Sequence, residues 1–210
     1  MGKRDFILDT MQELLKEEKG AACSVSDIAK RAGIAKGGLY YYLKSKEEVF
    51  DALVERTYEN VIEKCRSSIA DAAITPLQKL EMIYKTYRGT LIAASLDEYL
   101  HQPQNAHIHQ KSLAVILNSL SPIIAGVIRE GNEEGIFHCS YPEEISEFIM
   151  SIFCFLLDPG IFRWSNEQML TKLQVLASII ETQLGIHAGS LAFFYASSPA
   201  NAGKASPVRR

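Results

Sequence analysis

The spacing of apolar residues most constrains the fold of this chain, because it follows the period of an α-helix almost throughout. The segments with this spacing are residues 6–15, 49–69, 76–87, 113–137, 142–157 and 166–185. No stretch of any length alternates apolar and polar residues as a half-buried strand would, and no internal repeat is visible. The sequence therefore predicts an all-α fold.

Capping and breaking residues predict where some helices begin and end. Ser24 can cap a short helix whose third residue is Asp27, and Gly33 can end that helix. Ser45 can cap the long helix that follows. Pro122 lies inside a later apolar segment, where its ring predicts a kink or a break.

Composition indicates an ordinary soluble protein. The chain has 210 residues, enough for one large domain or for a small domain fused to a larger one. Its four cysteines form no CxxC pair, so we expect reduced, mostly buried thiols. The first residues carry no signal-peptide pattern, and the most apolar run, 148–157, is too short to cross a bilayer. These features predict a cytoplasmic protein without a membrane partner.

One window of the sequence is basic, although the formal net charge of the chain is −3. Between residues 30 and 46 there is no acid, and the basic residues are Lys30, Arg31, Lys36, Lys44 and Lys46. Such a window is typical of a small anion-binding surface on a larger body. The alternative is a solvated helix face, which the charge pattern by itself favours.

The basic window contains the run AKGGLYYYLKSK, which has the spacing of the last part of a helix-turn-helix. In that unit the final helix enters the major groove of DNA. Three consecutive tyrosines point about 100° apart on a helix, so they cannot all face one core. Leu39 and Leu43, four residues apart, are the predicted core contacts. The residues predicted to lie at the DNA are Ser24, Lys36, Gly37, Gly38, Tyr40, Tyr41, Tyr42 and Lys46.

Residues 24–53, SVSDIAKRAGIAKGGLYYYLKSKEEVFDAL, resemble the DNA-binding domain of the TetR family of bacterial transcriptional regulators. The residues that stand on the family's pattern are Ile28, Ala29, Ala32, Gly33, Ile34, Gly37, Leu39, Tyr40, Lys46 and Glu47. Three residues depart from it: Ala35 replaces a common Ser, Gly38 a common Thr, and Leu43 a common Phe. The match covers about the first quarter of the chain.

The resemblance implies a sequence-specific DNA-binding regulator, namely a repressor that a small-molecule inducer releases from its double-stranded operator. It implies an all-α homodimer with a three-helix helix-turn-helix domain and a larger helical domain for ligand binding and dimerisation. We place these domains at residues 1–47, with the motif at 24–43, and at residues 48–187. Residues 188–210 would form a tail that is disordered at its end. A DNA-binding protein without a ligand is an alternative.

The resemblance also implies that the last two helices, near 143–157 and 166–184, form a four-helix dimer interface. Their apolar stripes are wide, which agrees with this role, although an internal core is the alternative. The predicted interface residues are Ile145, Ile149, Ile152, Leu156, Leu173, Leu176 and Ile180. Candidates for the inducer pocket are Tyr84, Tyr87, Tyr99, His101, Phe153 and Trp164, and for each of these core packing is favoured over ligand contact.

Other chemistry has little support in the sequence. None of the nucleophile, phosphate-loop, zinc-protease or dinucleotide motifs is present, so an enzyme is disfavoured and no cofactor is predicted. His107 and His109 lie on opposite sides of a helix, so we predict no metal site from them and His101. The run Leu191–Ala196 is apolar enough to dock, but its partner cannot be read from the sequence.

Overall fold

A computed structural model describes residues 2–15, 17, 23–70, 73–89 and 94–196. The described residues form helices, turns and bends and include no strand, which confirms the all-α prediction. The chain divides into two compact units. The first unit is Met1–Val61 with Thr90–Val115, and the second is Ile62–Gly89 with Ile116–Arg210.

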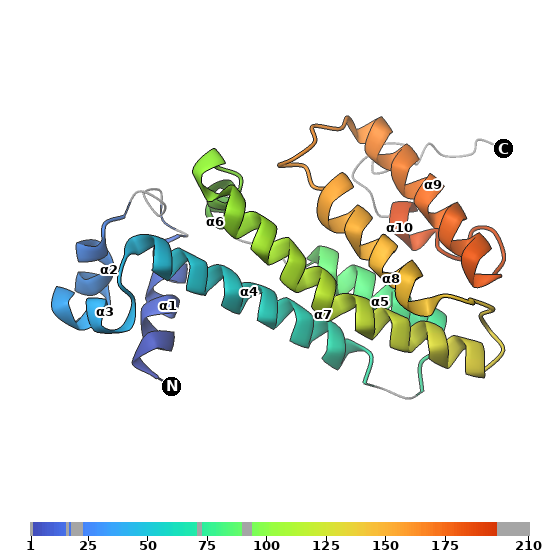
Figure 1. The fold of residues 1–210 in the computed structure, drawn as a ribbon, viewed down its shortest axis with the longest axis horizontal. Coiled ribbons are helices and arrows are strands. Elements are labelled where there is room, and N and C mark those ends of the chain that lie inside the picture. The colour runs from blue at the N-terminus through green and yellow to red at the C-terminus, as the bar shows by residue number, and fades with distance from the viewer. Residues whose placement is uncertain (1, 16, 18–22, 71–72, 90–93, 197–210) are drawn as a thin grey trace, which may run out of the picture. The chain divides into compact units, whose positions relative to one another are not determined.

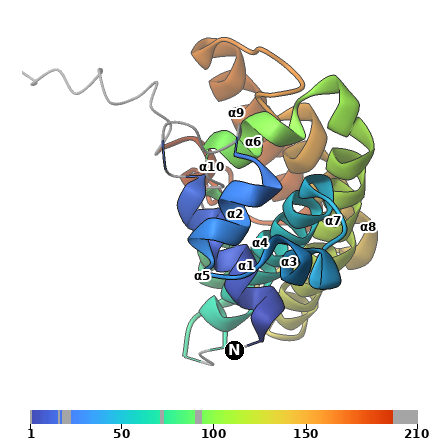
Figure 2. The same ribbon diagram turned by 90° about the vertical axis from the view of Figure 1, so that its left-hand side faces the viewer.

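The first unit is built on a cluster of three short helices, drawn in blue in Figures 1 and 2. Its elements are α1 (Lys3–Leu14), α2 (Val25–Arg31), α3 (Lys36–Tyr42), the first part of α4 (Lys46–Ser68), α6 (Ala94–Leu100), η2 (Pro103–Asn105) and the start of α7 (Ala106–Glu133). The buried core is formed by Ile7, Leu8, Met11, Ile28, Leu39, Leu43, Phe50 and Leu53. These side chains come from all four of the first helices, so their burial fixes how α3 is presented.

Backbone hydrogen bonds define the turn between α2 and α3. Gly33 has a φ of 64°, in the left-handed region that glycine adopts without strain. The Ile34 amide donates to the Ala29 carbonyl (3.0 Å) and the Gly33 amide to the Lys30 carbonyl (3.2 Å). This Schellman pattern satisfies the last carbonyls of α2 and redirects the chain into α3. The predicted end of the helix at Gly33 is confirmed.

The second unit surrounds an apolar interior. Its elements are α5 (Pro76–Gly89), α8 (Pro142–Ser151), a π-helical turn (Ile152–Leu156), α9 (Asn166–Leu184) and α10 (Phe193–Ala196), with the remaining parts of α4 and α7. A largely buried ion pair joins α5 to α7, with 2.5 Å between Lys79 Nζ and Glu130 Oε1. Gly185, with a φ of 67°, ends α9 where the sequence predicted.

Two helix boundaries differ from the predictions. No break occurs at Pro122, because α7 runs unbroken through it. Pro122 is exposed, so solvent can reach the backbone carbonyl that its missing N–H leaves unpaired. The helix predicted near 143–157 is α-helical only to Ser151 and then continues as the π-helical turn.

One helical stretch, residues 103–133, is long and apolar enough to cross a membrane by length and composition alone. A core helix of a water-soluble protein passes the same test. Leu120, Ile124 and Ile128 of this stretch are buried within the second unit, so its apolar side chains have a role in the core.

The end of the described chain is ordered against the second unit. Leu191 is fully buried, and its amide donates to Glu181 Oε1 at 2.7 Å. Helix α10 lies against α9 (Figure 1). The apolar run that sequence analysis could not place is therefore part of the second unit. The disorder predicted at the end of the tail falls on residues 197–210, which lie outside the described residues.

The packing of α7 gives a test with an internal control. A Cβ added at Gly131 would lie 2.1 Å from Cδ2 of the buried Phe137, a severe clash, whereas one added at Gly126 would lie 3.8 Å from the Arg129 guanidinium, an ordinary contact. We expect Gly131→Ala to lower the free energy of unfolding by about 1–3 kcal/mol through overpacking. Gly126→Ala should raise it by about 0.5–1 kcal/mol, as alanine does in helices.

Urea denaturation followed by circular dichroism measures both changes. Equal effects of the two variants would contradict the packing described around Phe137.

Candidate DNA-binding surface and ligand pocket

Helix α3 exposes the tyrosine run to solvent. The exposed fractions of Tyr40, Tyr41 and Tyr42 are 42%, 82% and 37%. On the opposite face, Leu39 and Leu43 are buried, as predicted. The rings of Tyr41 and Tyr42 meet edge to face, with 5.0 Å between centroids. The helix thus presents three phenolic hydroxyl groups on a solvent-exposed surface. Such an arrangement can bind phosphates and base edges.

Lysines and glycines complete this surface. Lys36 and Lys44 are exposed, and Lys36 Nζ lies 6.0 Å from the centre of the Tyr40 ring. Nothing lies within 4 Å of a Cβ built on Gly37 or Gly38, so the fold does not require glycine at these positions. The absent side chains instead leave room for another molecule to approach the backbone closely.

Ser24 has a structural role in the unbound protein. Its hydroxyl oxygen accepts from the Asp27 amide (3.2 Å) and the hydroxyl donates to Asp27 Oδ2 (2.7 Å), while its own amide donates to Oδ2 (2.8 Å). This confirms the predicted cap of α2. The hydrogen bonds from the Ser24 hydroxyl and amide lower the pKa of Asp27 below its usual value.

Arg56 on α4 anchors α1, a contact that sequence analysis missed. Its guanidinium donates to Asp9 Oδ1 at 2.7 Å, to Gln12 Oε1 at 3.1 Å and to the Asp5 carbonyl at 3.3 Å. These bonds link residues more than forty positions apart, so no local sequence pattern signals them. They hold α1 and α4 together and so support the core behind α3.

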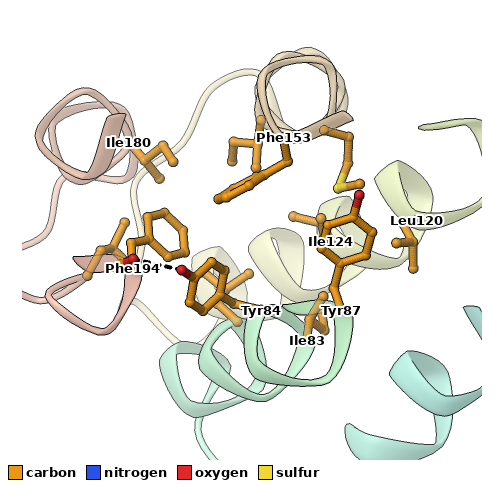
Figure 3. A pocket seen from close by; sticks show the side chains of 12 residues that line it. Ile83, Tyr84, Tyr87, Leu120, Ile124, Phe153, Ile180 and Phe194 are labelled. Atoms are coloured by element: carbon orange, nitrogen blue, oxygen red, sulfur yellow. Dashed lines mark hydrogen bonds between the residues drawn. The ribbon is translucent and has the colours of Figure 1, made fainter. Parts of the chain in front are cut away.

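The second unit contains an apolar pocket (Figure 3). Its lining residues come from α5, α7, α8, the π-helical turn, α9 and the C-terminal segment: Leu80, Ile83, Tyr84, Tyr87, Leu120, Ile124, Ile149, Met150, Phe153, Ile180, Leu191 and Phe194. None of these side chains carries a charge. The free volume is about 40 Å³. The pocket therefore suits uncharged, largely apolar groups, and in this conformation only very small ones.

Both tyrosines of this pocket have hydrogen-bond partners. The Tyr84 hydroxyl donates to the Phe194 carbonyl at 2.7 Å, shown as a dashed line in Figure 3. The Tyr87 hydroxyl and the Cys154 thiol lie 3.8 Å apart. Burial raises the pKa of Tyr84, and it raises the pKa of the Cys154 thiol to about 11. These groups are therefore neutral at physiological pH, which keeps the pocket apolar.

Only some of the predicted ligand residues meet in this pocket. Tyr84, Tyr87 and Phe153 line it. Tyr99 instead stacks on Phe50 in the first unit, with 4.1 Å between ring centroids. Trp164 lies in the loop before α9 and donates to the Leu156 carbonyl at 2.8 Å.

The remaining predicted ligand residue, His101, also lies in the first unit. Its ring meets that of His109 at 4.5 Å between centroids, whereas His107 lines a separate polar pocket with Asp51 and Lys111. The sequence did not predict that His101 and His109 would be neighbours. Their proximity depends on the fold of residues 97–109.

Many of the predicted dimer contacts are buried within the single chain. Ile149, Leu173, Leu176 and Ile180 have exposed fractions of 8% or less, whereas Leu156 is exposed and Ile145 and Ile152 are half-buried. The same helices expose other apolar residues, with fractions of 62% for Phe148, 54% for Phe155, 53% for Val175 and 54% for Ile179. The helices have apolar residues on two faces, and the sequence pattern could not tell the core face from the outer one.

Comparisons with known proteins agree with this arrangement. Residues 7–53 match the family described as bacterial regulatory proteins, tetR family, and residues 90–179 match the tetracyclin repressor-like, C-terminal domain. A fatty acid metabolism regulator protein from Bacillus subtilis is 29% identical over 61% of this chain and 68% of its own length. The transcriptional repressor KstR2 from Rhodococcus jostii is 26% identical over 69% of this chain and 72% of its own.

A solved transcriptional regulator from Cytophaga hutchinsonii shares the fold. Its TM-score is 0.67 at 17% identity, over 88% of this chain and 98% of that one. Both family matches name the same family, and they lie in the order that its two domains require. The chain therefore belongs to the TetR family and is a DNA-binding transcriptional regulator.

Proposed function

We propose that this protein binds its operator through the exposed face of α3 and represses transcription there until a small inducer releases it. The observation that carries the proposal is the outward display of Tyr40, Tyr41 and Tyr42 beside Lys36, on a helix whose other face is buried. Packing among the residues that the structure describes does not account for three adjacent exposed tyrosines. Contact with another molecule does account for them, and lysine with phenol groups suits a DNA groove and its phosphates.

The remaining predicted DNA contacts divide into two groups. Gly37 and Gly38 allow close approach of the backbone, and Lys46 at the start of α4 supplies a cation for a phosphate. Ser24 contributes through its cap on α2, and the same hydroxyl can accept one further hydrogen bond. We keep residues 1–47 as the proposed DNA-binding domain and 48–187 as the domain for ligand binding and dimerisation.

A homodimer is the proposed form on DNA. We assign its interface to the exposed apolar face of α8, the π-helical turn and α9, which carries Phe148, Phe155, Leu156, Val175 and Ile179. An apolar face of this size on a water-soluble protein calls for cover. Two copies would place two α3 helices in successive major grooves, about 34 Å apart along a symmetric operator. The proposed compartment is the cytoplasm, where the operator is.

The proposed inducer is rich in hydrocarbon, such as a fatty acyl compound. Two observations support this class. The pocket is lined by apolar and aromatic side chains without a charge, and one relative is a fatty acid metabolism regulator. Binding would favour a conformation in which two operator half-sites cannot be engaged together. A coupling free energy of about 1–3 kcal/mol is sufficient for such a switch.

Removing a phenol from α3 should weaken operator binding without unfolding the protein. For Tyr40→Ala and for Tyr41→Ala we expect a loss of about 10-fold or more in affinity, since each lost contact recurs in both subunits of a dimer. Fluorescence anisotropy with labelled operator DNA measures the effect. Tyr141→Ala serves as the control, because it removes a tyrosine of the second unit whose exposed fraction, 64%, lies between those of Tyr40 and Tyr41. Unchanged affinity in both α3 variants would overturn the role of this face.

A charge placed on the outer face of α9 should separate the subunits. Ile179→Glu puts a carboxylate in the centre of the proposed interface, and we expect a monomer at micromolar concentration. Size-exclusion chromatography with light scattering gives the mass. Gln174→Glu adds the same charge to an exposed position elsewhere on α9 and should leave the dimer intact. A wild-type chain that is itself monomeric would contradict the assignment.

Acyl compounds should release the protein from DNA. We expect dodecanoyl thioesters or esters to lower operator occupancy in a saturable way, and polar ligands of similar size to have no effect. Anisotropy titration at fixed protein concentration makes the comparison. An equal response to charged, polar and apolar ligands would rule out selection by this pocket.

A further inference from the structure

The apolar pocket is too small for the ligands it is suited to. Ligand pockets for molecules of drug size have volumes of about 300–1,000 Å³, whereas the free volume here is about 40 Å³. An acyl chain or an aromatic ring can enter only if a lining group moves away. The identity of that group decides which ligands the pocket accepts.

The lining groups differ in how they are held. Most lining residues belong to helices α5, α7, α8 and α9, which are 10 to 28 residues long, and Phe153 lies in the π-helical turn that continues α8. Leu191 and Phe194 belong instead to the short C-terminal segment, in which α10 is a single turn. Displacing one helical turn breaks few backbone hydrogen bonds, whereas moving a long helix disrupts the core.

Phe194 occupies the pocket much as a ligand would. Its side chain is 7% exposed. The centroid of its ring lies 4.7 Å from the ring centroid of Tyr84 and 5.5 Å from that of Phe153 (Figure 3). Its carbonyl accepts the hydrogen bond from the Tyr84 hydroxyl. The segment thus presents one apolar group and one neutral acceptor oxygen to the pocket.

We propose that Phe194 is a displaceable plug and that the inducer replaces it as an uncharged hydrocarbon group carrying a carbonyl oxygen. The ligand's apolar part takes the space of the Phe194 ring, and its carbonyl accepts the hydrogen bond from Tyr84. This inference rests on the proposed role of the pocket in binding the inducer.

Two charged groups lie near the plug: the Arg88 guanidinium at the Tyr84 hydroxyl, and the Glu181 carboxyl group at the Leu191 amide. Glu181 is 6% exposed, and its Oε1 accepts from the Leu191 amide at 2.7 Å. When the segment leaves, this carboxyl group loses that donor and faces the opened space. A ligand carboxylate beside it would add a like charge. An ester, thioester or ketone carbonyl avoids that repulsion.

Hydrogen exchange on the full-length wild-type protein tests the displacement directly. The probes are methyl dodecanoate and the fluorescent amine N-phenyl-1-naphthylamine. At saturation with either probe, amide exchange in Leu191–Ala196 should become faster, while exchange in the centre of α9 stays the same. Exchange that is unchanged or slower in Leu191–Ala196 with the pocket filled would overturn the plug.

Two substitutions test the chemistry of the plug. Phe194→Ala should bind N-phenyl-1-naphthylamine about 10-fold more tightly than the wild type, because no ring has to be displaced. The control is Tyr141→Ala, which removes an exposed aromatic ring of the second unit that does not line the pocket. Tyr84→Phe should lower the affinity for the ester relative to that for the amine about 3- to 10-fold, the usual worth of one hydrogen bond.

The outcomes separate this inference from the proposed function. Probe binding with release of operator DNA but with no change in the exchange of Leu191–Ala196 would leave the inducer role intact and refute the plug. Failure of both probes to bind the wild type and the folded Phe194→Ala variant would refute the pocket as an inducer site, and the plug with it. If Phe194→Ala does not fold, the exchange experiment on the wild type still decides.

Discussion

The burial of Leu39 and Leu43 is the constraint on which the DNA-reading surface depends. Both side chains are buried in the core of the first unit; Leu39 lies on α3, which is only seven residues long, and Leu43 caps the C-terminal end of that helix. With these two side chains buried, Tyr40, Tyr41 and Tyr42 have no core to enter and must face outward. Gly33, whose φ lies in the left-handed region, and the hydrogen bonds of Arg56 hold the helices around this core in place. The surface is therefore a consequence of packing behind it.

In the second unit, packing determines the shape of an interior pocket. Its helices line an apolar pocket, and the C-terminal segment contributes Leu191 and Phe194 to that lining. A filled pocket stabilises the unliganded protein, because it avoids an empty cavity lined by aromatic groups. It also makes ligand binding a replacement of one apolar group by another. The free energy of ligand binding then depends on the difference in burial between the ligand and the Phe194 side chain that it replaces. It does not depend on the full burial of the ligand.

Local features of this fold could be predicted from the sequence, since they depend on neighbours within a few residues. The Ser24 cap, the Gly33 turn and the α9 boundaries are of this kind. Of the two alternatives predicted at Pro122, a kink or a break, the break does not occur, because a proline in a helix is tolerated where solvent reaches the freed carbonyl.

Features that depend on tertiary packing could be predicted only in part. Residues such as Leu173 and Ile180 were assigned to the dimer, but their helices carry apolar side chains on two faces and only the packed structure separates them. Tyr99 was a candidate for the pocket for which core packing was favoured, and it stacks on Phe50. Phe194 lies 110 residues from Tyr84, to which it is bonded, so no pattern in the sequence joins them.

The central claim is that two exposed α3 surfaces read a specific DNA sequence together. The most direct test is fluorescence anisotropy of the purified protein with DNA from upstream of its own gene, across a salt series and against a scrambled sequence. We expect saturable binding that is far tighter than binding to the scrambled DNA, with an affinity that falls steeply as the salt concentration rises. Equal and weak binding to both DNAs would contradict it for that operator. Equal and weak binding to DNA selected from the whole genome would contradict sequence-specific DNA binding by this protein.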